Sequence, residues 1–247
     1  MNVEYRKACQ SMTTLIRLDK YLADLGVGTR SEVKNYIRKG RVTVDGVKVN
    51  SPDIKIDTKA SVTFDGFLLQ FDLFEYYMLN KPAGVVSATA DNFCTTVIDL
   101  IGEGKKKELF PVGRLDKDTE GLLIITNDGD LAHKLLSPKK HVPKVYFARV
   151  KGTVTKEDEL ILREGVDLGD FKALPAELTI LESNEESLVE ITIFEGKFHQ
   201  VKRMFEALGK EVLYLKRLSM GELRLDETLE VSQYRKLTSE ELALLKK

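Results

Sequence analysis

The feature that most constrains the fold is the run GRLDKDTEGLLIITNDGDLAHKL, which covers residues 113–135. Asp116 stands in a predicted tight turn after an apolar stretch, and the apolar strand 122–125 follows it. The polar residues 127–130 then open a predicted helix. A carboxylate on a turn between buried elements has a rigid support, which suits a nucleophile or a general base. Taken alone, GRLD is equally consistent with a surface aspartate that favours a turn.

Composition limits the class of protein. The 247 residues are 43% hydrophobic, which is enough for one large domain or two smaller ones. No apolar stretch reaches the roughly 18 residues of a membrane span, and the first residues lack a signal-peptide pattern. Cys9, Cys94 and the three histidines have no metal-ligand spacing. We therefore expect a cytoplasmic, metal-free protein that does not bind a membrane.

The net charge of −1 hides a separation of charge along the chain. Residues 14–50 hold eight Lys or Arg and four acids, and residues 131–152 hold six Lys or Arg and no acid. Residues 153–195 hold twelve acids and three bases. A basic face formed in this way could meet phosphates. For the acidic block, ordinary solvated helices and strands are the preferred interpretation.

The sequence predicts two folded parts. Residues 14–61 read as two helices and a hairpin, because apolar residues at 18, 22 and 25 share a helical face and a capping box covers 29–32. Asp45-Gly46, between two valine-rich segments, is a hairpin signal. The other predicted parts are a flexible leader (1–13), a linker (62–74) and a second domain (75–247).

The segment RLDKYLADLGVGTRSEVKNYIRKGRVTVDGVKV resembles the S4 RNA-binding domain. In that family, the second helix and the hairpin turn present basic residues to structured RNA. Arg30, Lys34, Arg38 and Arg41 match those positions. The first three recur every four residues, so they share one helical face and are expected to contact phosphates rather than bases. The alternative is an amphipathic helix with a solvated basic face.

Residues 75–247 alternate hairpin-like strands with helices, which predicts an α+β fold with a mainly antiparallel or mixed sheet flanked by helices. The predicted strands are 76–80, 121–126, 145–152, 178–183, 188–196, 211–218 and 222–225. The predicted helices are 95–101, 129–136, 198–209 and a last one that begins near residue 238.

Five segments of this second part occur in one order: LNKPAG (79–84), GRLD (113–116), KVYFARV (144–150), EGKFHQVKRMF (195–205) and RLDETLEVSQYRKLTSEE (224–241). Their order and content resemble the ribosomal small-subunit pseudouridine synthase A family. The resemblance runs from about Leu15 to near the end of the chain. It implies isomerisation of uridine to pseudouridine in RNA, without a cofactor or a metal. In that reaction the N-glycosidic bond breaks, the uracil turns, and C5 joins C1′.

The resemblance also implies roles for three residues. Asp116 takes the position of the catalytic aspartate, which acts on either the base or the sugar. Tyr146 takes the position of the tyrosine that packs on the flipped base and assists deprotonation of C5. Lys202 takes the position of the basic residue that pairs with the aspartate. Independently, burial would raise the pKa of a carboxyl group, and a neighbouring cation would counter that shift.

Other residues receive weaker assignments. Arg114 matches an arginine that helps to hold the target base out of the helix. Arg203 is expected to meet phosphate or an acid, and Lys81 to touch RNA or the catalytic loop. His199 is interpreted as a structural histidine, because no step needs a proton shuttle there.

The resemblance points to one uridine of small-subunit (16S) ribosomal RNA, either free or in a partly assembled particle. The form HQVKRM and the absence of a long basic tail favour this branch over the large-subunit (23S) synthases. Two alternatives stay open: a carboxylate pair of Asp116 with Asp118 or Glu120 for glycoside hydrolysis, and a non-catalytic S4-type RNA-binding or ribosome-assembly protein. A monomer is expected.

Overall fold

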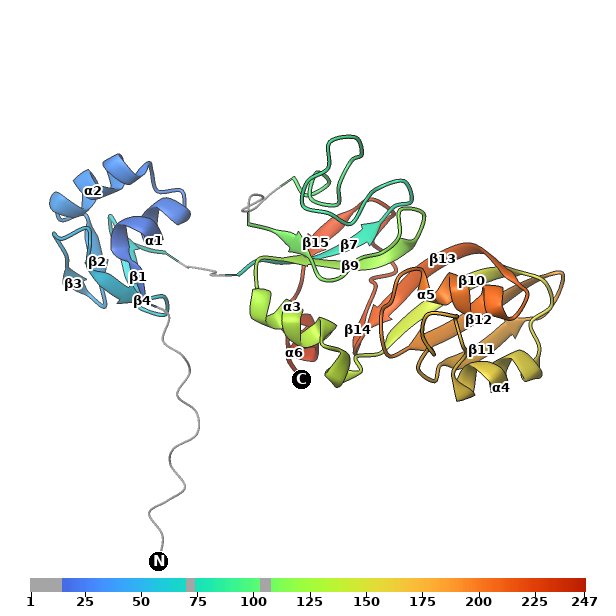
Figure 1. Ribbon diagram of the computed structural model, residues 1–247. Helices are drawn as coiled ribbons and strands as arrows, with labels where there is room; N and C mark the ends of the chain where they lie inside the picture. Colours follow the sequence, from blue (N-terminus) through green and yellow to red (C-terminus); the bar gives the residue numbers. More distant parts are fainter. Residues whose placement is uncertain (1–14, 70–73, 103–107) are drawn as a thin grey trace, which may run out of the picture. The chain divides into compact units, whose positions relative to one another are not determined.

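The computed structural model describes residues 15–69, 74–102 and 108–247 (Figure 1). The predicted leader, residues 1–13, lies outside the described residues. The chain divides into two compact units, and the boundary falls after residue 73. Within the described ranges, no helix is long and apolar enough to cross a membrane.

The first unit contains the predicted helix pair. A capping box opens the second helix, because the Thr29 side chain accepts from the Glu32 amide while the Glu32 carboxylate accepts from the Thr29 amide at 2.8 Å. Leu22, Val33 and Ile37 are fully buried between the helices and the strands. The elements are β1 (Leu15–Arg17), α1 (Leu18–Asp24), α2 (Arg30–Arg38), β2 (Val42–Val44), β3 (Val47–Lys48), β4 (Lys55–Asp57), β5 (Val62–Phe64) and β6 (Phe67–Leu69).

The first unit extends further than the sequence predicted. Strands β5 and β6 belong to its four-stranded sheet, whose order is β3-β2-β5-β6, so residues 62–69 are not a linker. Val62 is fully buried in the core. Asp65 and Gly66 both have positive φ, as a two-residue hairpin turn requires. The strands are three residues each, too short for their alternation to stand out.

The second unit is built on one mixed sheet of nine strands. The main strand order is β11-β12-β10-β13-β9-β7-β15. In addition, β14 pairs with β13, and β8 pairs with β9. Only the β13–β9 pair is parallel among the described strand pairs, which confirms the mainly antiparallel sheet. The strands are β7 (Tyr76–Lys81), β8 (Phe110–Pro111), β9 (Glu120–Thr126), β10 (Lys144–Lys151), β11 (Glu177–Glu182), β12 (Glu186–Ile193), β13 (Glu211–Met220), β14 (Leu223–Arg224) and β15 (Tyr234–Lys236).

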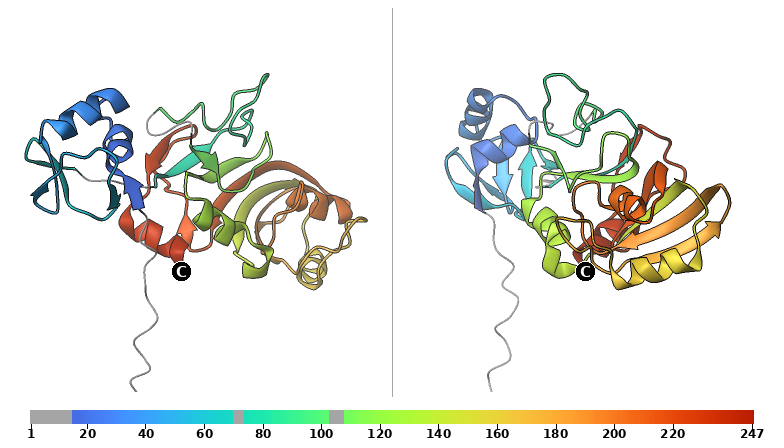
Figure 2. Two further views of the ribbon diagram at one scale, coloured as in Figure 1. Left: turned by 60° about the vertical axis from the view of Figure 1, so that its left-hand side comes forward. Right: turned by 45° about the vertical axis from the view of Figure 1, so that its right-hand side comes forward.

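Two hydrophobic cores lie on opposite faces of this sheet. Along β9, Leu122 and Ile124 enter one core while Leu123 and Ile125 enter the other, as the two-residue period of a strand dictates. Helices α3 (Gly129–Leu136) and α6 (Ser239–Lys246) lie together on one side of β7 and β9 (Figure 2). Helix α5 (Gln200–Ala207) contributes to the other core.

Two helix predictions differ from the structure. The predicted helix 95–101 is replaced by consecutive turns at residues 97–100, where the amides of Asp99 and Ile101 donate to the carbonyls three residues back, those of Thr96 (3.2 Å) and Ile98 (3.1 Å). Helix α4 (Lys156–Glu164), not predicted, begins with a capping box between Thr155 and Asp158. A short 3-10 turn, η1 (Pro138–Lys140), follows α3.

Candidate active site

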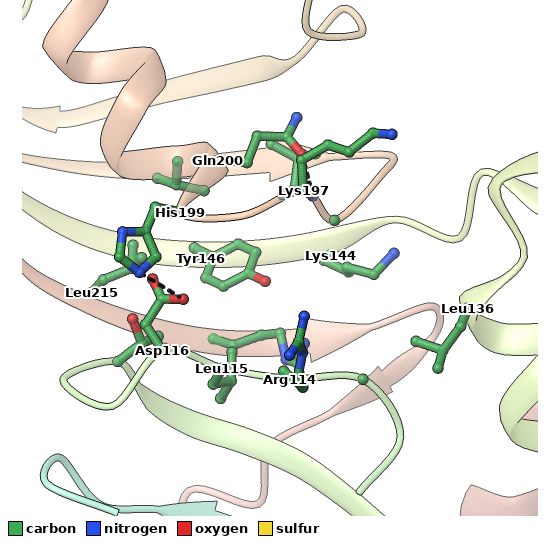
Figure 3. A pocket seen from close by; sticks show the side chains of 16 residues that line it. Arg114, Leu115, Asp116, Leu136, Lys144, Tyr146, Lys197, His199, Gln200 and Leu215 are labelled. Carbon is green, nitrogen blue, oxygen red and sulfur yellow. Dashed lines mark hydrogen bonds and ion pairs between the residues drawn. The ribbon is translucent and has the colours of Figure 1, made fainter. Parts of the chain in front are cut away.

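Three segments that the sequence singled out meet at one open pocket (Figure 3). The loop before β9 supplies Asp116, strand β10 supplies Tyr146, and the approach to α5 supplies His199. Strand β13, next to β10, completes the wall. Residues separated by about eighty positions in the sequence are therefore brought together by the pairing of β9, β13 and β10.

The loop that carries Asp116 is held by Lys81, the last residue of β7. The Lys81 side chain is fully buried, and its ammonium donates to the carbonyls of Pro82 (2.9 Å), Asp116 (3.1 Å), Lys117 (3.3 Å) and Thr119 (2.9 Å). Burial lowers the pKa of Lys81 to about 8, against the opposing effect of nearby carboxylates. Of the two predicted contacts of Lys81, RNA or the catalytic loop, the structure has the loop, and the buried side chain does not reach the surface.

A glycine allows the loop to approach β13. Gly121 has φ +98°, and a Cβ there would lie 2.3 Å from the Arg217 carbonyl oxygen. It sits where β9 pairs in parallel with β13, opposite Arg217. A side chain at this position would push the two strands apart, so the glycine of GLLIIT fixes the distance between the Asp116 loop and β13.

Beside the pocket, the Lys202 ammonium lies between two carboxylates, and one of these, Asp116, lines the pocket. The Lys202 ammonium, from the first turn of α5, is 3.5 Å from Asp116 Oδ2 and donates to Asp118 Oδ1 at 2.6 Å. The hydrogen bond from Lys202 holds the pKa of Asp118 below its ordinary value. His199 Nε2 lies 3.6 Å from Asp116 Oδ1 (Figure 3). The predicted proximity of Lys202 to Asp116 is present, but the shorter contact is to Asp118.

The tyrosine lies beside this cluster. Tyr146 is buried in the pocket wall, with its ring between Asp116 and Lys144 in the close view (Figure 3). In the antiparallel register it stands directly opposite Arg217 on β13, so the two side chains share one face of the sheet. Arg114 is exposed at the pocket edge and has no ion pair with another described residue.

The Arg203 side chain contacts neighbouring residues of the same chain. Its guanidinium donates to the Leu168 carbonyl at 2.8 Å, pairs with the Asp170 carboxylate and lies 5.3 Å from the centre of the Phe171 ring. Of the two predicted partners, phosphate or an acid, the structure has the acid. The side chain anchors the loop 168–171.

The basic residues of the first unit divide into two kinds. Arg30 and Arg38 are exposed on α2, and Lys34 between them has its ammonium 3.9 Å from Asp19. Arg41 instead pairs with the Asp65 carboxylate and lies 4.6 Å from the ring centres of both Tyr36 and Phe64. The Arg41 guanidinium therefore holds the β5–β6 turn in place. The sequence predicts that Arg41 faces RNA, but in the structure one acid and two rings already contact its guanidinium.

Sequence reasoning missed four buried polar residues that line the pocket: Thr119, Lys144, Gln200 and Arg217. Lys144 stands two positions before Tyr146 on the same strand, which was the available signal that both face one side. Within the described ranges, no group of three or more His, Cys, Asp or Glu residues could hold a metal ion.

Comparison with known families agrees with this architecture. The S4 domain profile matches residues 16–62, and the RNA pseudouridylate synthase profile matches residues 75–207. Fold and pocket therefore define an RNA-modifying enzyme with an added RNA-binding unit. The chain belongs to the RNA pseudouridylate synthase family.

Similar proteins cover almost the whole chain. An uncharacterized RNA pseudouridine synthase of Bacillus subtilis (strain 168) is 48% identical over 93% of this chain and 98% of its own length. The ribosomal small subunit pseudouridine synthase A of Yersinia pestis is 40% identical over 92% and 97%. The ribosomal large subunit pseudouridine synthase B of Bacillus subtilis is 36% identical over 93% and 95%. A crystal structure of a pseudouridylate synthase, 36% identical, aligns over 93% of this chain and 99% of that chain with a TM-score of 0.66.

Proposed function

We propose that this enzyme isomerises one uridine of small-subunit ribosomal RNA to pseudouridine, with Asp116 as the nucleophile. The observation that carries the proposal is the convergence of Asp116 and Tyr146 at one pocket, with the Lys202 ammonium 3.5 Å from Asp116 Oδ2. Relatives named ribosomal small subunit pseudouridine synthase A, such as the 40% identical Yersinia pestis protein, support the choice of RNA.

The chemistry is an isomerisation with no net change in composition. The bond between C1′ and N1 breaks, the uracil turns, and C5 forms a new bond to C1′. C5 loses its proton, and N1 gains one. The Lys202 ammonium, 3.5 Å from Asp116 Oδ2, lies beside the carboxylate that we assign as the nucleophile. Tyr146 offers a ring on which the uracil stacks, and we assign it the assistance of C5 deprotonation.

A uridine inside folded RNA must leave its stack to enter the pocket. We assign to Arg114, which is exposed at the pocket edge, the role of holding the target base out of the RNA helix. The basic face of α2, formed by Arg30, Lys34 and Arg38, supplies contacts to phosphates that position the RNA without reading its sequence.

A large-subunit substrate is the second candidate, because the 36% identical Bacillus subtilis protein carries that name. The two candidates share one pocket and one chemistry, and they differ only in the RNA. Pseudouridine mapping separates them. Purified enzyme is incubated with small-subunit RNA, large-subunit RNA and partly assembled small subunits.

We expect one new pseudouridine in small-subunit RNA. A new pseudouridine confined to large-subunit RNA would retain the chemistry and reject the proposed substrate. Absence of modification in every RNA, with tight binding retained, would favour an S4-type binding protein without activity.

A further inference from the structure

Two buried cations on adjacent strands line the pocket. Arg217 on β13 is 2% exposed, and its Nε donates to the Leu122 carbonyl at 2.8 Å. Its Nη2 is buried and has no hydrogen-bond partner among the described residues. A guanidinium nitrogen taken from water without a partner costs free energy. Such a group marks a place where a ligand supplies the missing acceptor.

Lys144 lies on the same face as Arg217. It is 7% exposed, and its ammonium donates to the Val142 carbonyl at 2.7 Å. Burial and repulsion from Arg217 lower its pKa to about 8, while Glu195 acts in the opposite direction. Neither cation has a carboxylate within ion-pair distance in the described part of the chain. We call Lys144 and Arg217 the cationic floor.

The cationic floor lies next to Tyr146. Arg217 is the direct cross-strand neighbour of Tyr146, and Lys144 is two residues away on the same strand. A ring stacked on Tyr146 would therefore present its edge to these cations. The Thr119 hydroxyl, also buried and without a partner among the described residues, lines the same pocket. Uracil carries two carbonyl oxygens on its edge, which are acceptors of the kind that these donors lack.

We propose that Arg217 and Lys144 bind the carbonyl oxygens of the flipped uracil and stabilise the negative charge that the base carries when its bond to C1′ breaks. This inference rests on the proposed function. When the C1′–N1 bond breaks, the Asp116 carboxylate forms a bond to C1′, and the electron pair of the broken bond stays with the uracil and spreads from N1 onto O2 and O4. A preformed, buried cation stabilises such charge without having to reorganise. The charge on the uracil disappears when C5 bonds to C1′ and displaces the Asp116 carboxylate, after which C5 loses its proton and N1 gains one.

The test measures single-turnover rates at saturating RNA for the full chain and three variants. Arg217→Lys keeps the charge but shortens and reshapes the donor, and Lys144→Met removes the second charge. Arg149→Lys, exposed on β10 and paired loosely with Glu186, is the matched control. We expect Arg217→Lys to slow turnover about 100-fold, as for loss of a transition-state donor. The control should retain the wild-type rate.

RNA with a modified target base distinguishes two roles of Arg217 and Lys144, namely binding the uracil and supporting the fold. RNA with 2-thiouridine or 4-thiouridine at the target replaces one oxygen and gives an intrinsically more stable base anion. Relative to wild type, we expect the loss of rate caused by Arg217→Lys to be about tenfold smaller on one of these thiouridine RNAs than on uridine RNA. The loss caused by Lys144→Met should become smaller in the same way. If Arg217→Lys does not fold, as thermal unfolding would reveal, Lys144→Met carries the same comparison.

Equal deficits on uridine and both thiouridines would overturn the inference and leave the proposed function intact. A deficit that shrinks only with a phosphorothioate 5′ to the target would overturn it in favour of a phosphate site. A wild-type enzyme with no activity on any RNA would overturn the proposed function, and this inference with it.

Discussion

At the scale of single residues, the site depends on two ammonium groups, of which Lys81 is buried and Lys202 is partly exposed. Lys81 binds four loop carbonyls and keeps no surface, while Lys202 bridges two carboxylates at the pocket. The first fixes the loop that carries Asp116. The second supplies charge where the chemistry is proposed.

Lys81→Met should separate the positioning of the loop from the binding of RNA. The change leaves several carbonyls without a donor, so we expect the free energy of unfolding to fall by roughly 2–4 kcal/mol. Turnover should fall more than RNA affinity, because the loop carries Asp116 rather than the RNA contacts. Denaturant unfolding and single-turnover rates test this. Lys117→Met, exposed on the same loop, is the control and should change neither quantity much.

The ionisation of Lys144 makes the free energy of unfolding depend on pH. Its pKa is about 8 in the folded protein, against an ordinary value of 10.5. Between these values the unfolded chain binds more protons, so the stability of wild type relative to Lys144→Met should rise as pH increases from 8 to 10.5. The total gain is at most about 3 kcal/mol. Urea unfolding of both proteins across this range measures it, and a difference that stays flat would contradict the buried ammonium.

At the scale of elements, the basic residues of the first unit have two different roles. Those on helix α2 face solvent, and Arg41 holds the β5–β6 turn. Arg38 points to solvent, whereas Arg41 holds Asp65 and two rings. Arg38→Glu should weaken RNA binding about tenfold and reduce the salt slope by about one contact, with turnover at saturating RNA unchanged. Arg41→Gln should instead lower the unfolding midpoint. Salt-dependent binding and thermal unfolding of both variants test this division.

Sequence patterns correctly predicted those helices and strands that depend on interactions between residues close in sequence. The capping box of α2, the buried strand β9 and helix α5 are confirmed because each depends on residues close in sequence. The same signals failed for residues 95–101, where Thr96 and Asp99 form a helix-type cap but the following backbone amides bond three residues back and the chain makes only turns. Arg217 was missed because its place depends on the parallel β13–β9 register, a pairing between strands ninety residues apart that no local pattern encodes.

At the scale of the whole molecule, the two units have separate hydrophobic cores. Leu22 is fully buried in the core of the first unit. Leu22→Ala should destabilise that unit by about 3 kcal/mol through lost contacts and a cavity. Calorimetry should show one transition moved to lower temperature and the other unchanged. A single transition that moves as a whole would contradict independent folding of the units.

The central claim is that Asp116 performs the chemistry while its neighbour Asp118 does not. Both lie on one loop and both approach the Lys202 ammonium, so Asp118→Asn is a matched control for Asp116→Asn. The direct measurement is the single-turnover rate of pseudouridine formation at saturating RNA. We predict no detectable product with Asp116→Asn, and a rate within about tenfold of wild type with Asp118→Asn. Product formation by Asp116→Asn at the wild-type rate would contradict the account.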